Sequence, residues 1–316
     1  MPTYAIGVPT PFRGLTERQG MVWRGPAGWA EWSPFLDYDG PELVPWLRAA
    51  DEAAELGWPD PVRTVVEVNS TIPAVGPEAA FARARAAGCR TAKVKVAEPG
   101  GSLAEDVARV EAVRDALGSD GRVRVDANGG WSEDQAAAAI RQLSEFDLEY
   151  VEQPCRTVEE LARLRRRLAR TGVSVLIAAD ESIRRAEDPL RVARLGAADV
   201  AVLKVQPLGG VRASLEIAER IGLPVVVSSA LETSIGLRAG LALAAALPEL
   251  SYACGLNTTG LLAGDLTTRA FTAVDGVIQL REIEVDPAAL ERHRAAPAVA
   301  EFWQARLVRT RKLADA

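Results

Sequence analysis

One unit recurs eight times along this 316-residue chain, and it restricts the folds that the chain can adopt. Each unit opens with a short run rich in β-branched residues, and alanine-rich amphipathic stretches lie between the runs. The runs occupy residues 63–69, 91–97, 122–128, 148–154, 174–182, 200–206, 224–230 and 250–256. Strands that alternate with helices pair in parallel through right-handed crossovers, and eight such units make a closed barrel. We therefore predict an α/β protein with a TIM-like barrel. The competing fold is an open doubly wound sheet, but no GxGxxG follows the first run.

The first 60 residues follow a different pattern. They hold five of the seven tryptophans, and short strand-like pieces precede one expected helix at residues 41–57. We predict an α+β capping domain over residues 1–62 and a barrel carrying the active site over residues 63–282. Part of residues 283–316 is expected to pack back on the cap. The loop at residues 11–20 carries glycines and charges, so it is either a lid over the barrel mouth or a surface hairpin.

Composition excludes several classes of protein. The formal charge of −6 and the pI of about 5.2 argue against a nucleic acid or an anionic membrane as partner. The most apolar stretch, GLALAAAL, is too short to span a bilayer, and no secretory signal is visible. The three cysteines lie far apart without a CxxC motif, which predicts neither disulfides nor a zinc site and favours the cytoplasm. No obligate protein partner is evident.

Lysine is scarce and unevenly placed. Of 37 basic residues only four are lysines, and three of these, Lys93, Lys95 and Lys204, lie in apolar runs. Arginine keeps its proton in proteins, whereas a lysine whose pKa is lowered can release it. The three lysines are therefore candidates for proton transfer, and Lys312, in a polar tail, is expected to be an ordinary surface residue.

Acidic residues end the runs that lie between these lysines. Asp126, Glu152 and Asp180 come at the ends of the third, fourth and fifth runs, and strand ends meet at the mouth of a barrel. Three converging carboxylates repel one another, and a hard divalent ion relieves this repulsion. We predict Mg²⁺ at this place, with Mn²⁺ as a substitute. The alternative is a ring of carboxylate–lysine pairs that only closes the barrel.

The spacing of two lysines suggests a general base. Lys93 and Lys95 share one strand face about 7 Å apart, and at an effective dielectric of about 20 they repel by about 2 kcal/mol. Lys95, nearer the mouth, is better placed to reach a substrate. The one histidine, His293, lies in a polar segment, so lysine or carboxylate must transfer protons. A metal beside two amines suits abstraction of the α-proton of a small-molecule carboxylate.

Together, in this order, the motifs resemble the enolase superfamily, in the branch that includes muconate lactonizing enzymes. They are Lys93-Val94-Lys95, Asp126-Ala127-Asn128, Glu152-Gln153-Pro154, Asp180-Glu181-Ser182, and Lys204 ahead of Gly209-Gly210. The resemblance implies a (β/α)₇β barrel with an N-terminal cap, and Mg²⁺ ligated by Asp126, Glu152 and Asp180. It also implies that Lys95 and Lys204 flank the substrate as catalytic residues.

Further residues are candidates for binding substrate or supporting the metal site. They are Lys93, Arg124, Asn128, Glu181, Ser228, Ser229 and Gly255. The two serine hydroxyls and the backbone N–H of Gly255 are expected to donate to a substrate carboxylate. For Arg124 two roles stay open, because it either helps to hold a ligand or the metal site, or pairs with a neighbouring side chain.

Within this branch the sequence is most similar to the o-succinylbenzoate synthases of actinobacterial type. The stretches that carry this similarity are VDANGGW, VEQPC, AADESI and SSALETSIGL. The implied reaction is the syn dehydration of 2-succinyl-6-hydroxy-2,4-cyclohexadiene-1-carboxylate to 2-succinylbenzoate in menaquinone biosynthesis. In this reaction Lys95 removes the α-proton and returns it to the departing hydroxyl, and Lys204 stays protonated.

Three other activities stay open at this point. An N-acylamino acid racemase or a dipeptide epimerase of the same superfamily would use Lys95 and Lys204 on opposite faces of the substrate. The stretch CGLNTTG counts against the epimerase, because an Asp-x-Asp motif is expected there. The alternative of a different class is a Schiff-base aldolase that uses Lys204.

Overall fold

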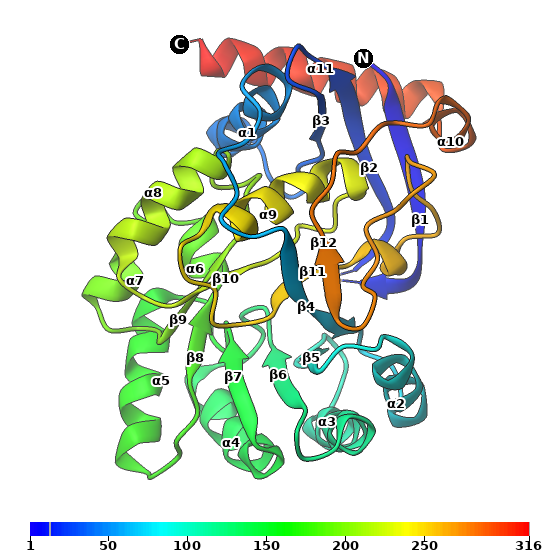
Figure 1. The fold of residues 1–316 in the computed structure, drawn as a ribbon. Coiled ribbons are helices and arrows are strands. Elements are labelled where there is room, and N and C mark those ends of the chain that lie inside the picture. Colours follow the sequence, from blue (N-terminus) through cyan, green and yellow to red (C-terminus); the bar gives the residue numbers. More distant parts are fainter. Residues whose placement is uncertain (13, 316) are drawn as a thin grey trace.

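The computed structural model describes residues 1–12 and 14–315, and it consists of a barrel whose mouth is covered by a smaller sheet (Figure 1). The barrel strands are β4 (Val65–Ile72), β5 (Thr91–Lys95), β6 (Arg122–Asp126), β7 (Leu148–Glu152), β8 (Ile177–Ala179), β9 (Val200–Leu203), β10 (Val225–Val227) and β11 (Cys254–Asn257). Consecutive strands from β4 to β10 pair in parallel, and β11 pairs with β4. A parallel bridge between Ser228 and Gly255 joins β10 to β11 and closes the ring. The predicted barrel is confirmed, and each of the eight predicted runs overlaps a strand.

Helices follow each of the first seven strands and cover the outside of the barrel. They are α2 (Pro77–Ala86), α3 (Leu103–Leu117), α4 (Glu133–Leu143), α5 (Val158–Arg170), α6 (Glu181–Arg184), α7 (Arg191–Arg194), α8 (Val211–Ile221) and α9 (Ser234–Ala246). Three of them begin at capping boxes, in which a hydroxyl and a side chain three residues later satisfy each other's backbone N–H groups. After β11 the chain instead forms η3 (Thr259–Leu261) and β12 (Val277–Gln279), which runs antiparallel to β4. This is the (β/α)₇β arrangement.

The cap is an antiparallel sheet with helices on it. It contains β1 (Thr3–Phe12), β2 (Leu15–Arg24), β3 (Trp29–Trp32), η1 (Gly40–Glu42) and α1 (Leu43–Glu55). The C-terminal helices are α10 (Pro287–Arg292) and α11 (Pro297–Ala314), and α11 packs against α1 across the top of the molecule in Figure 1. The ring of Trp303 meets that of Trp32 edge to face at 5.5 Å, so the C-terminal helix shares the core of the cap. The predicted boundaries at residues 62 and 282 stay predictions. Within the described ranges, no helix combines the length and the apolar character that crossing a membrane requires.

Two carboxylates of the cap bind the starts of barrel helices. Glu52 on α1 accepts a hydrogen bond from the backbone N–H of Arg212 at 3.2 Å and another from Val211, at the start of α8. Glu31 on β3 accepts from the hydroxyl of Thr233, the N-cap of α9, and from the N–H of Gly236 at 3.0 Å. Since helix N-termini attract negative charge, these contacts dock the cap on the loops that follow β9 and β10.

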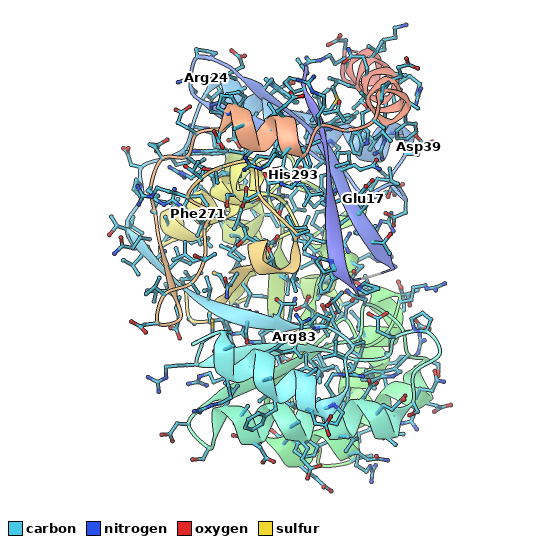
Figure 2. The ribbon with its side chains drawn as sticks, turned by 90° about the vertical axis from the view of Figure 1, so that its right-hand side faces the viewer. Glu17, Arg24, Asp39, Arg83, Phe271 and His293 are labelled. Carbon is cyan, nitrogen blue, oxygen red and sulfur yellow. The ribbon has the colours of Figure 1, made fainter. Side chains whose placement is uncertain are left out.

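The tip of the β1–β2 hairpin lies over the barrel mouth. The ring centroid of Phe12 is 5.0 Å from the Nζ of Lys95, and Phe12 is nearly buried there. Higher on β1, Thr10 accepts a hydrogen bond at 2.8 Å from Arg83 of α2, a barrel residue that Figure 2 labels below the cap residues Glu17 and Arg24. Within the loop predicted at residues 11–20, residue 13 lies outside the described residues.

Candidate active site

Strand register brings the predicted charged residues together in two layers inside the barrel. Lys95 on β5 is in register with Asp126 on β6, and Asp126 with Glu152 on β7. Side chains in register on neighbouring strands share a face, so these three lie side by side at the mouth. Two residues earlier on the same strands, Lys93, Arg124 and Tyr150 form the layer below.

The upper layer is a chain of ion pairs. The Nζ of Lys95 donates to Asp126 Oδ2 at 2.6 Å. Lys93 extends from the layer below and donates to both oxygens of Glu152 at 3.0 Å, with Asp126 Oδ2 at 3.4 Å. All four side chains are buried, so each charge depends on its partner for stabilisation.

A second group of ion pairs surrounds Asp180, directly after β8. Lys204, just beyond β9, donates to Asp180 Oδ2 at 2.7 Å, and the Nε of Arg184 donates to Oδ1 at 2.8 Å. Arg184 also donates to the hydroxyl of Tyr38 in the cap and to Glu181. The cap is therefore linked to Asp180 through one guanidinium.

Asn128 joins these two groups. Its side-chain oxygen accepts a hydrogen bond from Lys95, and its backbone N–H donates to Asp126 Oδ1 at 3.0 Å. Its amide nitrogen donates to Glu181 Oε1 at 3.3 Å. Asn128 holds a φ of +46°, a left-handed conformation that asparagine tolerates better than most residues and that turns the chain back over the strand end.

Burial and charge shift the pKa values of this cluster in opposite directions. Burial would lower the pKa of the Lys93 ammonium, but Glu152 and Asp126 outweigh burial and hold that pKa above its usual value. Burial opposes the ionisation of Asp126, yet the neighbouring ammonium groups of Lys95 and Lys93 keep its pKa below its usual range. Burial, and then the repulsion of Asp126, raise the pKa of Glu152. Lys93 is therefore charged in this arrangement, and the carboxylates still repel one another.

The donor set has the chemistry that a divalent cation prefers, because it offers buried carboxylate oxygens. As the side chains lie, however, the ammonium group of Lys93 bridges Asp126 and Glu152, and that of Lys204 pairs with Asp180. Over residues 1–12 and 14–315, no three acidic, histidine or cysteine side chains form a group that could hold a metal ion. The carboxylate–lysine pairs considered as the alternative are thus present. Since burial and mutual repulsion still raise the pKa of Glu152, a cation among Asp126, Glu152 and Asp180 would stabilise the cluster further.

A small cavity of about 20 Å³ lies between the charged residues and the cap. Three lysines and an acid line it below, namely Lys93, Lys95, Lys204 and Asp126. Its polar edge consists of Thr71, Ser228, Ser229, Gly255 and Thr258, and its apolar roof of Phe12, Phe35, Ala230 and Leu231. Lys95 and Lys204 therefore share one cavity. A space of this size holds about one water molecule, so a substrate must displace part of the roof.

The two predicted serines differ in their hydrogen bonds. The hydroxyl of Ser229 donates to Glu232 at 2.6 Å and accepts from the N–H of Leu231 and the hydroxyl of Thr258. This hydroxyl is committed to the loop after β10. Ser228 lines the cavity beside Gly255, where an added Cβ on the glycine would lie 2.6 Å from the serine Oγ. Gly255 thus leaves space for the Ser228 hydroxyl.

Arg124 lies in the lower layer of the barrel, below the cavity. It pairs with Glu149, donates to the carbonyl oxygen of Ala253 at 2.7 Å, and stacks on Tyr150 at 4.7 Å. Of the two roles left open for Arg124, pairing with a neighbour is the one that the structure contains.

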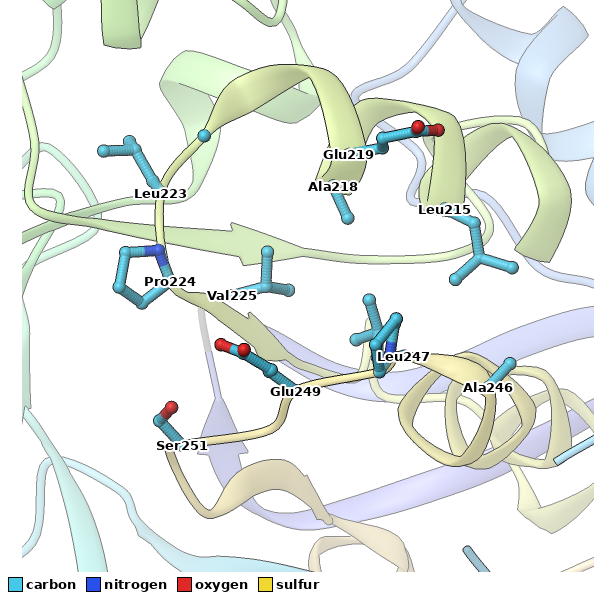
Figure 3. Close-up of a pocket in the computed structure, with 12 residues that line it drawn as sticks. Leu215, Ala218, Glu219, Leu223, Pro224, Val225, Ala246, Leu247, Glu249 and Ser251 are labelled. Atoms are coloured by element: carbon cyan, nitrogen blue, oxygen red, sulfur yellow. The ribbon is translucent and has the colours of Figure 1, made fainter. Parts of the chain in front are cut away.

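A larger hollow of about 710 Å³ lies at the opposite end of the barrel. Figure 3 shows its lining by Leu223 and Pro224 before β10, by the end of α8 and by the loop after α9. It contains no lysine. Barrel active sites form where strands end. Since this hollow lies where β10 begins, the smaller cavity is the candidate site.

Sequence reasoning missed Arg184, Tyr38 and Phe12. Arg184 stood in the sequence four residues after Asp180, a helical spacing that places the two side chains together. Tyr38 and Phe12 come from the cap, and nothing in the barrel sequence pointed to them.

Comparisons with known proteins agree with this architecture. Residues 78–285 match the family model described as "Enolase C-terminal domain-like", and residues 3–54 match "Enolase N-terminal domain-like". A relative from Thermobifida fusca, named o-succinylbenzoate synthase, is 61% identical over 98% of this chain and 95% of its own. Relatives of the same name from Mycolicibacterium smegmatis and Mycobacterium tuberculosis are 53% and 50% identical over 92% and 95% of this chain, and over 89% and 90% of their own. The predicted resemblance is confirmed.

Solved structures match the fold. The muconate lactonizing enzyme of Pseudomonas fluorescens superposes with a TM-score of 0.78 at 23% identity, covering 93% of this chain and 98% of that one. The L-Ala-D/L-Glu epimerase of Bacillus subtilis superposes with a TM-score of 0.74, also at 23% identity, covering 90% and 95%. At this identity the likeness concerns the fold alone.

Proposed function

This chain belongs to the enolase superfamily, and on that premise we propose that it is an o-succinylbenzoate synthase. It would convert 2-succinyl-6-hydroxy-2,4-cyclohexadiene-1-carboxylate to 2-succinylbenzoate by removing an α-proton and eliminating water from the same face, as a step of menaquinone biosynthesis. The observation that carries the chemistry is that Lys95 and Lys204 line one small cavity above buried carboxylates.

Lys95 is the general base. It reaches the cavity from the end of β5, and Asp126 and Asn128 hold its nitrogen by two hydrogen bonds. Those acceptors orient the amine, so that its lone pair, once a proton is lost, points at the carbon next to the substrate carboxylate. The ammonium formed in that step then protonates the hydroxyl that leaves from the same face.

Lys204 stays protonated and stabilises the negative charge that builds up on the substrate. Its pairing with Asp180 at 2.7 Å favours the ammonium form. In a buried cavity such a charge acts through a low dielectric and is worth more than in water.

Mg²⁺, or Mn²⁺ in its place, would be held by Asp126, Glu152 and Asp180, with Asn128 and Glu181 beside them. When bound, the ion would neutralise a substrate carboxylate and so make the neighbouring proton more acidic.

Neutral donors would bind the carboxylate groups of this small-molecule substrate. The hydroxyl of Ser228 lies on the polar edge of the cavity, where Gly255, whose backbone pairs with Ser228 between the strands, leaves space for it. Because the hydroxyl of Ser229 already donates to Glu232, this residue would instead support the loop.

We also propose that the protein works in the cytoplasm. Cys89, Cys155 and Cys254 are all buried free thiols, as a reducing compartment would keep them.

Turnover of the proposed substrate tests this function directly. Purified protein with Mg²⁺ and the cyclohexadiene substrate should produce the aromatic product, followed by its ultraviolet absorbance. Lys95→Ala should reduce kcat by at least about a hundredfold, the scale of general base catalysis, while the exposed Lys312→Ala serves as the matched lysine control. Absence of turnover in the wild type, or a Lys95→Ala variant as active as the wild type, would remove the assignment.

A further inference from the structure

Arg18 is a buried arginine of the cap that reaches into the barrel. It lies on β2, and its side chain is almost inaccessible to solvent. Its Nε donates to the carbonyl oxygen of Leu231 at 3.0 Å, and its Nη2 lies 3.3 Å from that of Ala230. Both carbonyls belong to the loop between β10 and α9. The described hydrogen bonds of Arg18 all go to backbone or hydroxyl oxygens.

The same guanidinium holds the opposite wall of the cavity. Its Nη2 donates to the backbone oxygen and, at 3.0 Å, to the hydroxyl of Ser33, and its Cζ lies 4.7 Å from the ring centroid of Phe35. Phe35 from the cap and Ala230 and Leu231 from the barrel all line the candidate cavity. Arg18 does not line it, but it contacts all three residues from behind.

Leu231 has a backbone conformation that needs such support. Its φ is +62°, a left-handed value that costs free energy for a residue with a branched side chain. Its N–H donates to Ser229 Oγ at 2.8 Å, and the N–H of Ala230 donates to Glu232 at 2.8 Å. The loop is therefore held from inside by Ser229 and Glu232 and from outside by Arg18.

We propose that Arg18 is a positioning residue, which locks Leu231 in its left-handed conformation and thereby sets the apolar wall against which the substrate binds. Losing Arg18 would let the loop relax and shift this wall, while Lys95 and Lys204 stay in place. Substrate binding should suffer more than the chemical step. The kinetic consequence rests on the proposed function, whereas the structural consequence does not.

Arg114 provides a matched control. It also donates to backbone carbonyl oxygens, namely those of Phe146, Gly118, Gly121 and Asp147, but at the opposite end of the barrel. Arg18→Met should raise KM about tenfold and lower kcat less than about threefold, since a charged hydrogen-bond donor is lost behind a binding wall. Arg114→Met should reduce thermal stability but leave both constants within about twofold. Arg18→Lys keeps the charge and one donor, so its KM should lie between that of the wild type and that of Arg18→Met.

Amide hydrogen exchange tests, without any substrate, whether Arg18 holds Leu231 in its left-handed conformation. In Arg18→Met, or in Arg18→Lys if the methionine variant does not fold, the amides of Ala230 and Leu231 should exchange at least about tenfold faster. Arg114→Met should leave the exchange rates of these two amides unchanged. Unchanged exchange in a folded Arg18 variant would overturn the proposal, and so would faster exchange with an unaltered KM. If the wild type fails to turn over the substrate, the proposed function is wrong. The exchange rates still decide whether Arg18 holds Leu231 in its left-handed conformation.

A pair of loop variants adds a second test. Leu231→Gly and Leu231→Ala both remove the side chain, but only glycine adopts the left-handed conformation without strain. With Arg18 present the two variants should have KM values within about twofold of each other. In the Arg18→Lys background the alanine variant should have a KM several times that of the glycine variant. Equal KM values in both backgrounds would contradict the role assigned to Arg18.

Discussion

Replacing Gly210 with alanine should destabilise the protein far more than the same change at Gly222, although the two glycines flank the same helix, α8. Gly210, the N-cap, has φ 120° and ψ 179°, a region that is essentially restricted to glycine. An added Cβ would lie 2.2 Å from Oε2 of Glu52, the carboxylate that caps this helix from the cap domain. Gly222 at the other end has φ 65° and ψ 21°, and no atom of the described residues lies within 4 Å of its added Cβ.

The expected cost has two parts. The backbone strain at position 210 costs about 1–3 kcal/mol, and displacing Glu52 from the N–H groups of Val211 and Arg212 costs about 0.5–2 kcal/mol more. Gly210→Ala should therefore lower the free energy of unfolding by about 1.5–5 kcal/mol, whereas Gly222→Ala should lower it by about 1 kcal/mol, near the lower end of the cost of a left-handed residue. Urea denaturation of the two variants measures the difference.

Comparison of single and double variants identifies the source of the loss. If Glu52 is the group displaced, Glu52→Ala combined with Gly210→Ala should cost less than the sum of the two single changes, because alanine at position 52 removes the clash. Equal losses for the two glycine variants, or full additivity with Glu52→Ala, would refute the reasoning.

Three other predictions concern the cavity, the metal and the interface between the cap and the barrel. Phe12→Ala should raise KM several-fold, because it opens the roof above Lys95; steady-state kinetics with an unchanged KM would argue against this closure. Exhaustive chelation should abolish turnover, and Mn²⁺ should restore it in the wild type but not in Asp126→Asn; activity that persists without metal contradicts the proposed site. Burial raises the pKa of Glu31 against the hydrogen bonds it accepts, so its folded state holds the proton more tightly than the unfolded state. Its contribution to stability is therefore complete below about pH 4 and is lost as pH rises through the raised pKa. Glu31→Gln should flatten that part of the stability curve, measured by urea denaturation between pH 4 and pH 8, and a curve parallel to the wild type would contradict it.

The barrel and the identity of its mouth residues were predictable because both follow from local patterns. A run of β-branched residues forms a strand wherever it is buried, and a charged residue that ends such a run must lie near the mouth. Lys95, Asp126 and Glu152 lie side by side because parallel strands place their ends in register. The order of these residues along the chain therefore predicted their order around the barrel.

Depth inside the barrel was not predictable in the same way. Arg124 shares a strand face with Asp126, so alternation alone made it a candidate for the site. Two residues correspond to a rise of about 7 Å along a strand, and that distance places Arg124 in the lower layer beside Glu149 and Tyr150. Lys93 starts in the same lower layer, but its long flexible side chain reaches Glu152 above it.

By itself, the sequence determined the eight-stranded barrel, the family, and the row of amines and acids along the strand ends, because each depends on residues that are close in the chain. Only the tertiary structure decided what surrounds that row. Arg18 and Leu231, which are in contact, lie 213 positions apart in the sequence, and Arg184 and Tyr38 lie 146 positions apart. A hydrogen bond of that kind depends on how the cap packs on the barrel, and no local periodicity records that packing.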